Sequence, residues 1–204
     1  MNNTILLQSI QYSINKQDVL KQLGYFPQKT AIDSGVEKKV DMSIDEGYIL
    51  SVPQALYRNF KVDRYDNGYR LVGTEYIIHS PILLRHLGEV ECVTLVVCTI
   101  GTELEFRVQE LIEQKKMTEA TLLNAVGGEA VEGVVEQVNE IVRREALLKK
   151  MKLRNRFSPG YGDWGLSEQR EIMTLLQAER IGITLTEACV MIPEKSVSAI
   201  IGWY

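Results

Sequence analysis

The sequence has little of what metal sites and disulfide frameworks require. It contains 3 cysteines and 2 histidines, with no CxxC pair and no HExxH motif. A buried zinc site needs several nitrogen or sulfur ligands at close spacing, so we expect no metal site, and we interpret His79 and His86 as ordinary core or surface residues. An odd number of widely separated cysteines suits reduced thiols, which favours a reducing compartment and places the protein in the cytoplasm.

Long apolar runs are also missing. None approaches the roughly 18 apolar residues of a membrane span, and the start of the chain lacks the basic segment of a signal peptide. We therefore expect neither membrane insertion nor secretion. The formal net charge of −4 argues against nucleic acid or anionic lipid as a partner.

The common phosphate-binding and hydrolase motifs are absent as well. The chain has no P-loop, no dinucleotide GxGxxG and no GxSxG elbow, and Gly160-Tyr161-Gly162 alone does not replace them. What the chain does have is 204 residues with 45% hydrophobic and 25% charged content, which suits one globular domain over residues 1–204. We see no internal repeat and no linker.

Apolar spacing predicts several helices, and the long one contains an unusual glycine pair. Helices are expected from Asn15 to Gly24, from Ser34 to a point before Pro53, from Gly101 through Ile112, and from Thr118 to Lys149. Ser34 to Glu37 has the form of a capping box. Gly127-Gly128 should weaken the long helix, because glycine costs about 1 kcal/mol relative to alanine there. Such a pair indicates close approach of another backbone or of a ligand.

Strand patterns predict a mainly antiparallel sheet. Glu91 to Ile100 is β-branched and almost continuously apolar, which is typical of a central strand covered on both faces. Asp66-Asn67-Gly68 predicts a turn inside a hairpin or meander between Asp63 and Pro81. Thr184 to Ile192 and Ser196 to Tyr204 are expected to form a C-terminal hairpin, residues 184–204, beside the central strand. The expected fold class is α+β, a twisted antiparallel sheet flanked by helices.

A loop rich in glycine and aromatic residues follows the long helix. Residues 156–165 read Arg-Phe-Ser-Pro-Gly-Tyr-Gly-Asp-Trp-Gly and fit neither helix nor regular strand. One interpretation is a tight connection with Phe157 and Trp164 in the core. The other is a ligand site, because the guanidinium of Arg156 suits a carboxylate and the loop leaves backbone groups free. The next helix should be capped by Ser167 and end at Gly182.

Several motifs after the long helix occur in a recognisable order. Arg156 to Tyr161 is followed by a helix, then by Leu185-Thr186-Glu187-Ala188, and then by Pro193 to Ser198. This series resembles the C-terminal motifs of the activation domain of cobalamin-dependent methionine synthase, and the resemblance covers Arg154 to Tyr204. The ligand loop within it spans residues 154–165. Several motifs in the same order make the match more specific than Pro-Gly-Tyr alone.

The resemblance implies a site for S-adenosylmethionine. Arg156 would hold the ligand's carboxylate, and Gly160 and Tyr161 would contact it through backbone and ring, with Ser158 in the same set. A glutamate from the preceding helix would complete the site. By the resemblance this glutamate corresponds to Glu129, with Glu132 as the alternative. Glu129 could equally be a residue of the helix surface.

The chain also departs from the family pattern. The family's N-terminal Ile-Asp-Trp-x-Pro-Phe stretch, whose aspartate contacts the ligand, has no counterpart here, and neither has the tyrosine pair that follows the last turn. We expect no folate, homocysteine or cobalamin modules in a domain of this size.

Two functions follow from the resemblance. The first is an accessory reactivation subunit that docks on a separate cobalamin-bearing methionine synthase and presents S-adenosylmethionine to it. A flavodoxin-like or other electron donor would then be a further partner. The alternative is a non-catalytic binding or regulatory module of a corrinoid methyltransferase system that has lost S-adenosylmethionine binding. The intact loop favours the first, and the missing ligand residues favour the second.

Overall fold

A computed structural model describes residues 3–26, 33–65 and 68–204. In chain order its elements are β1 (Ile5–Gln8), α1 (Lys16–Gln22), α2 (Ser34–Leu50), β2 (Gln54–Tyr65), β3 (Gly68–Leu71), β4 (Ile77–Ile78), α3 (Pro81–Leu87), β5 (Cys92–Thr99), α4 (Glu103–Glu113), α5 (Met117–Leu148), η1 (Leu166–Glu168), α6 (Gln169–Leu176), η2 (Ala178–Ile181), β6 (Thr184–Leu185), β7 (Met191–Ile192) and β8 (Ser196–Trp203).

The main sheet is antiparallel, with β5 in its interior. Its strand order is β4-β3-β2-β5-β8, and β1 also pairs with β2. β5 pairs with β2 from Cys92↔Lys61 to Thr99↔Gln54, and with β8 along its whole length. Residues 93–99 are buried. The prediction of a central strand covered on both faces is therefore confirmed.

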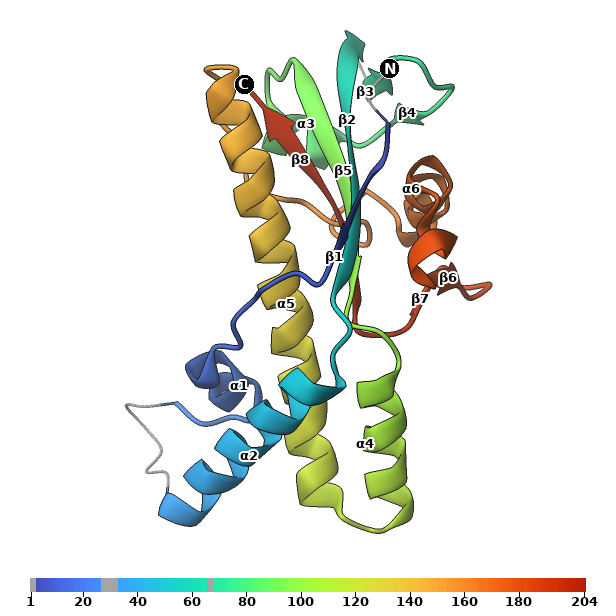
Figure 1. The fold of residues 1–204 in the computed structure, drawn as a ribbon. Helices are drawn as coiled ribbons and strands as arrows, with labels where there is room; N and C mark the ends of the chain where they lie inside the picture. Colours follow the sequence, from blue (N-terminus) through green and yellow to red (C-terminus); the bar gives the residue numbers. More distant parts are fainter. Residues whose placement is uncertain (1–2, 27–32, 66–67) are drawn as a thin grey trace.

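Helices cover the two faces of this sheet, so the fold is α+β. The long helix α5 lies along one face, and α3 and α6 lie on the other (Figure 1). The two core clusters follow this division. One joins Val134 and Val138 of α5 to Val96 and Cys98 of β5. The other contains Val97 of β5 and the buried apolar residues of α3 and α6. No helix within the described residues is long and apolar enough to cross a membrane.

The glycines of α5 mark places where other elements come close. A Cβ on Gly127 would lie 2.7 Å from Leu104, and one on Gly128 would lie 3.3 Å from Gln22. The closest backbone approach is at Gly133, where a Cβ would lie 2.5 Å from the carbonyl oxygen of Ser13. The N-terminal segment therefore crosses α5 directly above a glycine. Close approach was expected at the Gly127-Gly128 pair, and there it is made by the side chains of other elements. The close approach of another backbone lies further along α5, at Gly133.

The first helices begin close to where the sequence predicts, although one cap differs. Asn15 caps α1 by accepting from the N–H of Gln17 at 2.9 Å. α2 does begin at Ser34, but Asp33 is its cap and accepts from Gly35 at 2.7 Å. The predicted capping box at Ser34 is therefore wrong. An aspartate one position earlier offers the same kind of acceptor to the free amides of Gly35 and Val36.

A second cap was also predicted at the wrong place. Ser167 lies inside η1 and makes no capping hydrogen bond, and α6 starts after it. α6 ends before Gln177, which has a left-handed φ of 59°. Gly182 instead terminates the short helix η2. Two short 3₁₀ helices, η1 and η2, therefore flank α6. Apolar spacing alone does not distinguish this arrangement from one longer α-helix.

The predicted C-terminal hairpin is only partly correct. β6 pairs with β7 in a separate small sheet, with Leu185 opposite Met191. β8 does not pair with β7, and instead joins the main sheet at the edge of β5. Since β8 is buried along almost its full length, it needs a position covered on both faces, which a surface hairpin does not offer.

Between β2 and β4 the chain forms the expected meander. Tyr65 pairs with Gly68, and Tyr69 pairs with Ile78. The turn predicted at Asp66-Asn67-Gly68 has its first two residues outside the described part of the chain.

Candidate functional site

Residues 152–157, the edge segment, pair with β8 and form an extra edge of the main sheet. Lys152 and Tyr204 exchange two backbone hydrogen bonds of 2.8 and 2.9 Å, and the N–H of Arg154 donates to the carbonyl of Gly202 at 2.8 Å. Phe157 and Ile200 then exchange a further pair of 2.9 and 2.8 Å. The start of the loop was predicted to be irregular, yet it follows β8 like a strand. This pairing fixes the backbone on both sides of Arg156.

Arg156 is paired with two carboxylates of α5. Its guanidinium forms an ion pair with Glu132 and a second one of 3.5 Å with Glu136. The two glutamates lie one helical turn apart and therefore share one side of α5. The side chains remain partly open to water, since 30% of Arg156 and 47% of Glu132 is exposed. The result is one cation between two anions at an accessible position.

The other candidate glutamate faces a different neighbour. Glu129 accepts a hydrogen bond of 2.5 Å from the side-chain amide of Gln22. Burial raises the pKa of Glu129, and the Gln22 hydrogen bond partly offsets this increase. Of the two glutamates that the sequence left open, the structure brings Glu132 to Arg156 and places Glu129 against α1.

The ligand loop spans residues 154–165, and its second half is a compact turn that packs on a buried tryptophan. Trp164 is fully buried, and its carbonyl accepts from the N–H of Gly160 at 2.7 Å. Gly160 has a φ of +95°, which favours glycine. Tyr161 stands out, with 67% of its surface exposed, and its N–H lies 3.4 Å from the carbonyl of Ser158. The loop thus combines the expected core anchor with one exposed aromatic ring.

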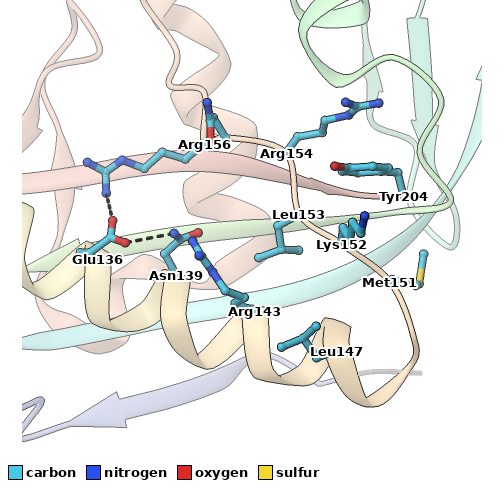
Figure 2. Close-up of a pocket in the computed structure, with 11 residues that line it drawn as sticks. Glu136, Asn139, Arg143, Leu147, Met151, Lys152, Leu153, Arg154, Arg156 and Tyr204 are labelled. Atoms are coloured by element: carbon cyan, nitrogen blue, oxygen red, sulfur yellow. Dashed lines mark hydrogen bonds and ion pairs between the residues drawn. The ribbon is translucent and has the colours of Figure 1, made fainter.

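A groove of about 560 Å³ extends from Arg156 between α5 and the edge segment. It is lined by Glu136, Asn139, Arg143, Leu147, Tyr204 and residues 151–156. Figure 2 shows the Arg156 guanidinium turned toward Glu136, while Arg154 lies over the ring of Tyr204, 3.9 Å from its centre.

Sequence reasoning missed this groove. Glu132, Glu136, Asn139 and Arg143 recur at helical spacing, a signal that was present but is also typical of a solvated helix face.

Known proteins resemble this chain in sequence pattern and in fold. The family model described as "Vitamin B12 dependent methionine synthase, activation domain" matches residues 81–203. A solved structure, "Crystal Structure of the MetH Reactivation Domain bound to AdoHcy", superposes with a TM-score of 0.72 at 16% identity, covering 98% of this chain and 78% of that one. At this identity the likeness supports the fold alone. No curated protein matches the chain.

Proposed function

Because the chain belongs to the activation domain family of vitamin B12 dependent methionine synthase, we propose that it binds S-adenosylmethionine between α5 and the ligand loop. The related solved structure carries S-adenosylhomocysteine, the same ligand without its transferable methyl group. A ligand of this type has an amino-acid end with opposite charges and an adenine end. The site must therefore offer both signs of charge and a surface for a flat ring.

The observation that carries this proposal is the charge arrangement around Arg156. Its guanidinium has the planar geometry that binds a carboxylate at two points. Glu132 and Glu136 beside it are suitable partners for the ligand's ammonium group. When the ligand enters, its carboxylate replaces one protein carboxylate at Arg156, and the freed glutamate receives the ammonium. The protein ions thus exchange partners, and none is left buried and unpaired.

The adenine end fits the second half of the ligand loop. The exposed ring of Tyr161 offers a face for stacking, and Gly160 lets the ligand approach the backbone closely. Ser158, which is half-buried, contributes its hydroxyl nearby. The ammonium role falls to Glu132 and not to Glu129 in this arrangement, because Glu132 pairs with Arg156, whereas an oxygen of Glu129 accepts from Gln22 of α1.

The proposed role is that of an accessory reactivation subunit. S-adenosylmethionine held by this chain would supply a methyl group to the reduced cobalamin of a separate methionine synthase protein and would remain as S-adenosylhomocysteine. This chain would bind the ligand, orient its sulfonium end outward and dock on the cobalamin protein. An electron donor, flavodoxin-like or of another kind, would be the third component. We propose the cytoplasm as its location, where the free thiols of the chain stay reduced.

Calorimetric titration of the chain with S-adenosylmethionine and with S-adenosylhomocysteine tests the proposal. We expect saturable binding of both ligands, and tighter binding once a cobalamin-bearing methionine synthase protein is added. Absence of binding both alone and with that protein would overturn the proposal. It would favour instead a module that keeps the fold and has lost the ligand.

A further inference from the structure

Helix α3 contacts the ligand loop at both of the loop's ends. At the first end, the Nε of Arg154 donates to the carbonyl of Leu87 at 3.0 Å, and Nε2 of His86 lies 2.7 Å from the carbonyl of Asn155. At the other end, Asp163 meets the first turn of α3. The exposed part of the loop, with Tyr161 at its tip, lies between these two attachments.

The Asp163 carboxylate is tied to α3 by several hydrogen bonds. Its Oδ1 accepts from the hydroxyl of Ser80 and, at 3.2 Å, from the N–H of Ile82, whereas its Oδ2 lies 3.3 Å from the same N–H. Ser80 is fully buried, and its hydroxyl oxygen also accepts from Leu83 at 3.0 Å. Since a serine hydroxyl donates once and accepts twice, these bonds are compatible.

The residues on either side of Asp163 leave it little freedom. Gly162 has a φ of +61°, and a Cβ there would lie 2.5 Å from the Cδ1 of Ile82. The backbone of the loop therefore touches α3 at this point. On the other side, Trp164 is fully buried. Asp163 is held between a glycine pressed against α3 and a tryptophan fixed in the core.

We propose that Asp163 is a positioning residue, which holds the Ser158 to Tyr161 part of the loop in the shape that receives the ligand. Three backbone hydrogen bonds involve this part of the loop: the N–H of Tyr161 lies 3.4 Å from the carbonyl of Ser158, the N–H of Gly160 donates to the carbonyl of Trp164 at 2.7 Å, and the N–H of Trp164 donates to the carbonyl of Tyr161 at 3.2 Å. Two of these bonds end on Trp164, the residue after Asp163, so the position of Tyr161 depends on how residues 163 and 164 are held. This inference rests on the proposed function, because the ligand it serves is S-adenosylmethionine.

Affinity and stability measured on the same variants test this role. Asp163→Ala removes both acceptor oxygens, Asp163→Asn keeps one of them, and Ser167→Ala is a control that removes an exposed hydroxyl from η1. We expect affinity for S-adenosylmethionine to drop about tenfold for Asp163→Ala and about threefold for Asp163→Asn, with no change for Ser167→Ala. The thermal midpoint without ligand should fall by only a few degrees in Asp163→Ala, because the buried Ser80 hydroxyl loses its acceptor, and it should fall less in Asp163→Asn, which keeps an acceptor oxygen.

Amide hydrogen exchange provides a readout that does not need the ligand. In Asp163→Ala, residues 158–164 should exchange faster, while the buried strand β5 keeps its protection. Wild-type affinity in Asp163→Ala would overturn the inference. So would an affinity loss that follows a general fall in stability and is not partly restored in Asp163→Asn. Wild-type protein that binds no S-adenosylmethionine would overturn the proposed function, and the exchange comparison would still decide whether Asp163 holds the loop.

Discussion

Arg156 and Glu132 form an ion pair that joins the ligand loop to α5 across 24 positions of sequence. Glu136, one helical turn further, contacts the same guanidinium. Exposed ion pairs of this kind add only about 0 to 1 kcal/mol to stability. The pairing therefore arranges these charges without locking them, and the proposed ligand would replace one partner at low cost.

Replacing Arg156 by lysine should separate ligand binding from stability. Arg156→Lys keeps the positive charge but loses the planar fork that binds a carboxylate at two points. We expect affinity for S-adenosylmethionine to fall by about one to two orders of magnitude, since hydrogen bonds to charged groups contribute roughly 1.5 to 3 kcal/mol. The thermal midpoint without ligand should barely move. A destabilised variant that binds with wild-type affinity would refute the ligand role of Arg156.

The two candidate glutamates of α5 form a matched pair of variants. Glu132→Gln removes the charge that would receive the ligand's ammonium, so affinity should fall about tenfold. Glu129→Gln should leave affinity unchanged, because its carboxylate is bound to Gln22 and an amide oxygen still accepts that hydrogen bond. Titration calorimetry on both variants checks the assignment. The opposite order of effects would assign the ligand to Glu129.

The choice between Glu129 and Glu132 shows what the sequence could not settle. Both lie on one helix three positions apart, and apolar spacing shows only which side of that helix is buried. Which glutamate meets Arg156 depends on where the edge segment runs beside β8. Those contacts join residues more than 40 positions apart in the chain, such as Phe157 and Ile200.

Two glycines of α5 should respond differently to substitution by alanine. In Gly133→Ala the new Cβ would lie 2.5 Å from the backbone oxygen of Ser13, so the crossing segment must shift, at a cost of about 1 to 3 kcal/mol. In Gly128→Ala the nearest atom is the end of the flexible Gln22 side chain at 3.3 Å. The helix there should gain up to about 1 kcal/mol. Denaturant unfolding measures both, and equal effects would contradict the crossing.

Glu105 should make stability depend on pH. Burial raises the pKa of this carboxyl, although the N–H of Lys195 donates to it at 2.8 Å and lowers the pKa somewhat. Because the pKa of Glu105 is higher in the folded state, its protonated carboxyl contributes fully to folding stability below the unfolded pKa of about 4.3. This contribution to stability is lost as pH rises through the folded pKa. Glu105→Gln, which stays neutral and still accepts from Lys195, should therefore be at least as stable as wild type near neutral pH.

The difference in thermal midpoint between Glu105→Gln and the wild type should shrink as the pH is lowered to about 4, where wild-type Glu105 takes up its proton. Glu194 is close to Glu105 and also raises its pKa, so both chains should be compared at the same ionic strength. Glu103→Gln, at an exposed position in the same first helical turn, is the control for removing a carboxylate from this helix. A constant difference across the pH range would refute the assignment.

Local sequence patterns predicted much of the secondary structure, but they failed where contacts between distant residues decide the structure. The central strand and the long helix follow from continuous and periodic apolar patterns, which burial imposes directly. The cap at Asp33 and the short helices around Gln177 depend on single dihedral angles. The pairing of β8 with β5 instead of β7 depends on strand competition over more than 90 positions, which no local pattern records.

The position of β8 also has a consequence for how the chain is made. Cys92 of β5 pairs with Trp203 of β8, so the ribosome releases β5 long before its neighbour exists. Until β8 emerges, one edge of the buried strand β5 stays open to pairing with other chains. Folding that waits for such distant contacts is slow, and partly folded chains are prone to aggregate during that delay. β5 gains its second neighbouring strand only when β8 docks.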